Sequence, residues 1–79
     1  MSGRRQLVYS YEGERDPGLE RRVAAMFPGA HTGEVQSGLQ GVTEVTLDLP
    51  GDPPADRVEA LRALPRILDA AAGSLGEGV

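Results

Sequence analysis

The stretch that decides the fold is QLVYSYEGERDPGL, residues 6–19. Its first part alternates large apolar or aromatic residues with smaller ones, and Gly13 follows, so we predict a strand over residues 6–11. One side of this strand presents Leu7, Tyr9 and Tyr11. We expect that side to face the core, because the other side offers only Val8 and Ser10. The alternative puts both tyrosines on an open sheet face, as a stacking or dimer surface.

The second part of the stretch predicts a helix start. Asp16 supplies an N-cap acceptor, and Pro17 suits the first helical position, where its missing N–H costs nothing. Four apolar residues then recur at helical spacing, which predicts a buried stripe on a three-turn helix. They are Leu19, Val23, Met26 and Phe27. We expect Pro28 and Gly29 to end the helix.

The next twenty residues predict a hairpin. We expect a weak strand near Thr32–Gln36, a turn at Ser37–Gly41 and a stronger strand near Val42–Leu49. The apolar side of the stronger strand consists of Thr43, Val45, Leu47 and Leu49. The hairpin would place a second and a third strand after the first helix.

A second helix is predicted after residues 50–51. Asp52 is the expected N-cap, followed by prolines at the first helical positions. The expected buried stripe is Val58, Leu61 and Leu64. Because Pro65 disfavours helical dihedrals at the residue before it, we predict that the helix stops by Leu64. Residues 66–70 then form either a fourth strand or a new helical turn running on to Gly73.

These elements predict an α+β, ferredoxin-like βαββα(β) fold, with an antiparallel sheet and two helices on one face. The third strand should return beside the first, and the weak strand should lie at a sheet edge. The 79 residues suffice for one domain. We expect a structured core of about residues 6–70, with loose ends at Met1–Gly3 and residues 74–79.

Composition excludes several function classes. The chain has no Cys, so it can hold neither a disulfide nor a thiolate metal site, and no apolar run approaches the length of a membrane span. All eight cations are Arg, which is typical of high-GC bacterial coding, and the net charge is −4. Only the pairs Arg4–Arg5 and Arg21–Arg22 could contact phosphates, so we expect no nucleic-acid partner. We expect a cytoplasmic protein without a cofactor.

Catalysis has one candidate residue. His31 is the only side chain that ordinarily titrates near neutrality, and we expect it in a solvent-exposed loop with no nucleophile to activate. A metal site would have to combine His31 with strand carboxylates, namely Glu34, Glu44 and Asp48. These residues match no established coordination pattern, so we expect a solvated acidic face, no metal and no enzymatic activity.

The loop before the first helix is the strongest functional motif. Free N–H groups at the helix start, together with Arg15, favour an anion there. The run Arg15-Asp16-Pro17-Gly18-Leu19 resembles the loop between the first strand and first helix of ACT domains. The run Leu61-Arg62-Ala63-Leu64-Pro65 before Ile67 resembles that family's exit from its second helix. His31 lies where amino-acid-binding members carry an Asn.

The ACT resemblance implies a βαββαβ regulatory module that binds an amino acid or similar carboxylate between two copies. The implied ligand residues are Arg15, Asp16, Gly18, Leu19 and His31. We therefore predict a non-catalytic regulatory module that forms a homodimer by pairing its weak edge strands, although Glu34 would approach its own copy. The alternative is an accessory subunit that docks on a larger protein and takes no small ligand.

Overall fold

The computed structural model describes residues 5–39 and 41–74. Its elements are β1 (Arg5–Glu12), α1 (Pro17–Ala25), β2 (His31–Leu39), β3 (Val42–Leu49), α2 (Ala55–Arg62) and β4 (Ile67–Ser74). The expected loose ends at Met1–Gly3 and 75–79 lie outside the described residues, and Ser74 is the last residue of β4. Of the two alternatives for residues 66–70, the strand is the one observed.

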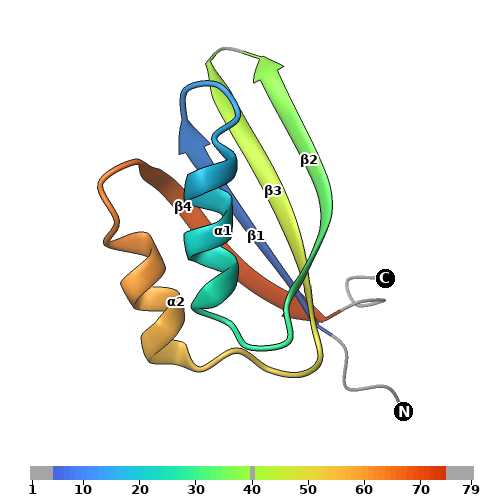
Figure 1. The fold of residues 1–79 in the computed structure, drawn as a ribbon. Helices are drawn as coiled ribbons and strands as arrows, with labels where there is room; N and C mark the ends of the chain where they lie inside the picture. Colours follow the sequence, from blue (N-terminus) through green and yellow to red (C-terminus); the bar gives the residue numbers. More distant parts are fainter. Residues whose placement is uncertain (1–4, 40, 75–79) are drawn as a thin grey trace.

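The fold is α+β, as predicted, with one antiparallel sheet. The strand order is β2-β3-β1-β4, so the third strand lies beside the first and β2 lies at an edge, as expected. Both helices cover the same face of this sheet (Figure 1). No helix of the described residues covers the other face, on which Val8, Ser10 and Thr46 are partly exposed.

The predicted orientation of β1 is confirmed. Leu7, Tyr9 and Tyr11 are each at most 1% exposed. They stand opposite Leu47, Val45 and Thr43 of β3, which are also buried. The two tyrosine rings stack with centroids 6.2 Å apart. Burial of this side, rather than of Val8 and Ser10, gives the sheet a continuous apolar face for the helices to cover.

Helix α1 begins as the sequence predicts. The Asp16 side chain accepts a hydrogen bond from the Leu19 N–H, and Pro17 occupies the first helical position. Leu19, Val23 and Phe27 are buried against the core, and Met26 is partly buried. The helix ends at Ala25, before the predicted stop at Pro28.

The hairpin differs from its prediction in one respect. Strand β2 runs from His31 to Leu39 and does not end at Gln36, so the predicted turn at Ser37–Gly41 is too wide. The extension is stabilised by pairing with the start of β3, where the Ser37 and Thr43 hydroxyls are 3.1 Å apart. Gly41 has a positive φ of 73°, which permits the tight reversal.

The start of α2 is a second correction. Asp52 is not the N-cap, because Pro54 occupies that position and makes no side-chain cap bond. The physical reason is that Asp52 and Pro53 each precede a proline and are therefore biased towards extended backbone. Asp52 pairs instead with Arg5 of β1. The helix ends at Arg62, which confirms the stop before Pro65.

Candidate functional site

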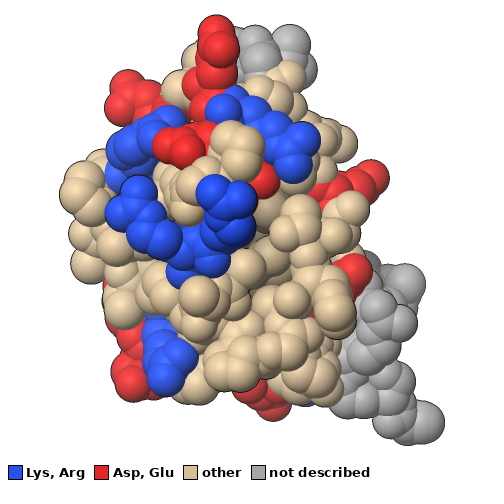
Figure 2. All heavy atoms as spheres, viewed as in Figure 1, with Lys and Arg blue, Asp and Glu red and all other residues tan. Residues whose placement is uncertain are grey.

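An open hollow lies between α1 and the turn that joins α2 to β4. We call it the arginine groove, and its volume is about 410 Å³. Its lining residues are Leu19, Arg22, Met26, Leu64, Pro65 and Arg66. Figure 2 shows basic side chains gathered around a tan hollow on the face that carries the helices. The groove therefore combines an apolar lining with cationic walls.

Arg66 forms a fixed wall of this groove. One of its terminal nitrogens donates to the Asp16 carboxylate, and the other donates to the Glu12 carbonyl oxygen at 2.9 Å. Its guanidinium carbon also lies 5.4 Å from the centre of the Tyr11 ring, in a cation–π arrangement. These three contacts tie the start of β4 to the β1–α1 loop. The guanidinium of Arg66 therefore already donates hydrogen bonds within the protein, which leaves fewer N–H groups for a ligand.

Arg22 forms the wall on α1 and, unlike Arg66, has a side chain that is not held by hydrogen bonds to other described residues. It is exposed on α1, and within residues 5–39 and 41–74 it makes no hydrogen bond through its side chain and no ion pair. Arg21, the preceding residue, is likewise exposed and unpaired there but does not line the groove. Arg22 is thus the cation at this site that retains its full capacity to bind an anion.

A buried polar cluster lies behind the β1–α1 loop. The Tyr11 hydroxyl donates to Glu20 Oε2 and accepts from the Asp16 N–H, each at 2.7 Å. Arg15 Nε lies 3.3 Å from the same Glu20 oxygen. Burial, and then the nearby Glu20 carboxylate, raise the pKa of Tyr11, although the Asp16 N–H bond opposes them. The phenol therefore remains a donor at neutral pH, and Arg15 pairs with the cluster while 55% of its side chain stays exposed.

Asp16 has both carboxylate oxygens engaged. Oδ1 accepts from the Leu19 N–H at 3.2 Å, and Oδ2 pairs with Arg66. The Leu19 N–H bond first, and the Arg66 bond second, hold the pKa of Asp16 below its usual value. The helix-start donors that would bind an external anion are thus partly occupied by Asp16 itself.

The structure separates the five residues that the sequence grouped as ligand residues. Arg15, Asp16, Gly18 and Leu19 lie together where β1 ends, and of these only Leu19 lines the groove. His31 lies at the other end of the sheet, opposite Asp48, whereas the end of β1 pairs with the start of β3 at Glu12 and Val42. His31 is exposed as expected, but it opens strand β2 rather than lying in a loop.

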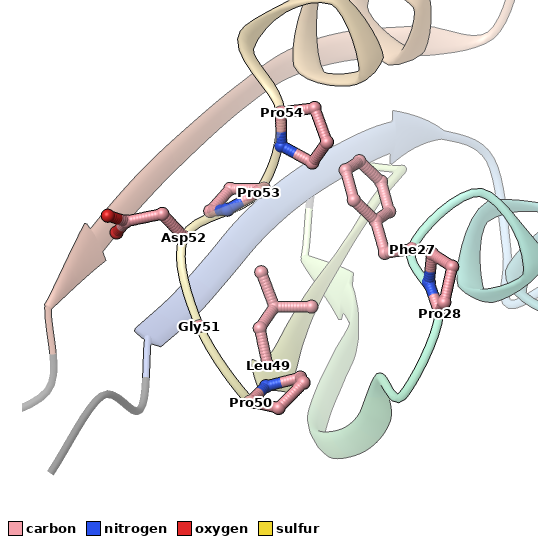
Figure 3. A pocket seen from close by; sticks show the side chains of 8 residues that line it. All are labelled: Phe27, Pro28, Leu49, Pro50, Gly51, Asp52, Pro53 and Pro54. Carbon is pink, nitrogen blue, oxygen red and sulfur yellow. The ribbon is translucent and has the colours of Figure 1, made fainter.

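A second hollow lies at the end of the molecule where α1 stops, with a volume of about 360 Å³. Its lining is Phe27, Pro28, Leu49, Pro50, Gly51, Asp52, Pro53 and Pro54. Figure 3 shows Asp52, its one charged residue, pointing away from the hollow, and Asp52 is paired with Arg5. With no charged side chain directed inward, this proline-rich hollow offers little that would orient a ligand.

The described part of the chain holds neither a cluster of metal-binding side chains nor a helix that could span a membrane. Among residues 5–39 and 41–74, no three His, Asp or Glu side chains lie close enough to share a metal ion. No helix in these same ranges has the length and hydropathy needed to cross a bilayer. The carboxylates that we considered with His31 stay distributed along β2 and β3.

The arginine groove was not predicted from the sequence, although several of its lining residues were named as core positions. Leu19, Arg22 and Met26 stand at i, i+3 and i+7 of α1, so helical spacing could have placed them on one face. Arg22 was considered only with Arg21, as a phosphate contact. Nothing in the local sequence shows that Leu64 and Arg66 lie across from that face, because this depends on how the two ends of the chain pack.

Comparisons with known proteins add no relatives. No family model matches the chain, and searches of curated proteins and of solved structures find no match.

Proposed function

We propose that this chain is a non-catalytic regulatory module of the cytoplasm that binds a small carboxylate with an apolar side group in the arginine groove. The observation that carries the proposal is Arg22, a cation without a partner among the described residues, beside an apolar hollow of about 410 Å³. A carboxylate can accept two parallel hydrogen bonds from one guanidinium, while its apolar part fills the hollow. Pockets of this size are typical of small-ligand sites.

The proposal includes a ferredoxin-like fold. Its support is the βαββαβ element order, with β1 at the centre of the sheet beside both β3 and β4. Two helices on one face of such a sheet form a valley between them. The arginine groove lies between α1 and the turn after α2, and its lining runs along α1 from Leu19 to Met26.

The proposal keeps the ligand class implied by the ACT resemblance and changes its location. Arg15 and Asp16 are engaged with Glu20 and Arg66, so the loop has few groups left for a ligand. We infer that the loop acts as the support of Arg66, and that the ligand contacts Arg22. A second copy is not needed to complete this site.

Thermal unfolding tests the proposal. We expect one member of a panel of apolar amino acids and their carboxylic-acid analogues to raise the Tm, since a ligand at 100 times its Kd adds about 2.7 kcal/mol. Arg22→Gln should abolish the shift. Arg21→Gln is the matched control, because it removes the same charge from the neighbouring helical position outside the groove, and it should retain the shift. Equal loss in both variants, or no shift with any ligand, would refute the proposal.

A second candidate is an accessory subunit that docks on a larger protein. Leu68 favours it, because this leucine is 56% exposed and lies on the edge strand β4. An edge strand presents unpaired N–H and C=O groups that another strand can meet. Loss of a copurifying partner in Leu68→Asp, with no ligand shift in the wild-type chain, would favour this candidate over the first.

A further inference from the structure

We propose that the arginine groove selects an apolar carboxylate that carries no ammonium group, in preference to a free amino acid. This inference rests on the proposed function and narrows its ligand class. It follows from the charges of the groove and from the hydrogen bonds that its neighbouring acids already make.

The walls of the groove contain cations and no acid. Arg22 and Arg66 are the only charged residues among the six that line it. The ammonium of an α-amino acid is attached to the carbon that bears the carboxylate. A carboxylate held by Arg22 therefore brings the ammonium close to a guanidinium, where like charges repel.

The two acids nearest in sequence to the lining residue Leu19 are Asp16 and Glu20, and both already accept hydrogen bonds. Asp16 accepts from the Leu19 N–H and from Arg66. Glu20 is 7% exposed and accepts from the Tyr11 hydroxyl and from Arg15. Arg66 already neutralises the Asp16 carboxylate, and Glu20 would have to leave the core to reach a ligand. A bound ammonium would thus find no unpaired carboxylate beside Leu19 to offset the loss of its water.

The remaining lining is apolar. It consists of Leu19, Met26, Leu64 and Pro65, and the side chains of Met26 and Leu64 are only partly covered by the core. Pro65 has no backbone N–H to donate. A branched aliphatic body would bury its surface here, and Met adapts readily to such shapes. The structure thus favours a ligand with one anionic end and an otherwise hydrocarbon body.

The test compares ligands that share one body. The wild-type chain is titrated, by NMR of its backbone amides, with 4-methylpentanoate, leucine, N-acetylleucine and 3-methylbutylamine. We expect the Kd of 4-methylpentanoate to be at least tenfold lower than that of leucine, and the amine not to bind. N-acetylleucine, which keeps the carboxylate and masks the ammonium, should recover the affinity that leucine lacks.

The site is verified with the same pair of variants. Shifts should centre on Leu19 and Met26, and Arg22→Gln should raise the Kd of 4-methylpentanoate at least tenfold while Arg21→Gln leaves it unchanged. Leucine binding as tightly as 4-methylpentanoate, with both dependent on Arg22, would overturn this inference and leave the proposed function intact. If leucine and both carboxylate analogues fail to bind, this inference is overturned. If, in addition, no ligand of the thermal-unfolding panel raises the Tm, the proposed function is overturned as well.

Discussion

Arg66 and Asp16 form an ion pair across 50 positions of sequence. The pair joins the start of β4 to the cap of α1, so the last strand and the first helix hold each other in place. Arg66 leans over the Tyr11 ring, and its position leaves little room above Gly13, where an added Cβ would lie 3.1 Å from the guanidinium. This contact builds one wall of the arginine groove.

The ion pair predicts how stability depends on pH. The folded-state pKa of Asp16 is lowered, mainly by the Leu19 N–H and next by Arg66, so its contribution is present above the ordinary pKa of 3.8 and is lost as the pH falls through the lower folded value. We expect the Tm of the wild-type chain to fall towards that of Asp16→Asn as the pH is lowered below about 4. A Tm difference that stays constant from pH 6 to pH 2.5 would contradict the pairing.

The two core tyrosines should respond in opposite ways to loss of the hydroxyl. The Tyr9 hydroxyl is buried with no hydrogen-bond partner among the described residues, so Tyr9→Phe should raise the unfolding free energy by about 1 kcal/mol. Tyr11→Phe removes the donor to Glu20 and the acceptor of the Asp16 N–H, so it should lower stability by about 1–3 kcal/mol. Urea unfolding of both variants checks the contrast. Equal effects would show that the Tyr11 cluster adds nothing.

The apolar stripe of α1 should contribute much of the stability of the core. Phe27 is 2% exposed, and Phe27→Ala should cost about 3–5 kcal/mol, enough to unfold a domain of this size. Leu68→Ala is the control, because this exposed side chain should change stability by no more than about 0.5 kcal/mol. Circular dichroism melts would distinguish them. A wild-type Tm for Phe27→Ala would remove α1 from the core.

Self-association through β2 remains our prediction. Two-fold pairing of the β2 edges about an axis close to Glu34 would bring this carboxylate near its own copy, where like charges repel. Glu34→Gln should therefore strengthen the dimer. Glu44→Gln removes the same charge from the interior strand β3 and should not. Sedimentation equilibrium at tens of micromolar is the measurement, and monomers throughout would exclude this pairing.

Local patterns predicted most of the elements correctly. The alternation in residues 6–11 and the cap at Asp16 each depend on neighbours within a few positions, and both appear where expected. Local patterns failed at Asp52, where two prolines held the chain extended, and at Ser37, where pairing with β3 lengthened the strand. At Ser37 the deciding constraint lies outside the motif, in the neighbouring strand, whereas at Asp52 it lies in the prolines of the motif itself, which disfavour helical backbone at the residues before them.

The sequence by itself determined the α+β class, the buried side of β1 and the start of α1, because periodicity and capping act over one or two turns of chain. The tertiary structure alone decided that residues 67–74 pair with β1, that Arg66 reaches Asp16, and that Arg22 stands beside Leu64 and Pro65. These contacts join residues about 40 to 70 positions apart. No local preference specifies them, since their free energy is gained only when the sheet has formed and both helices lie on it.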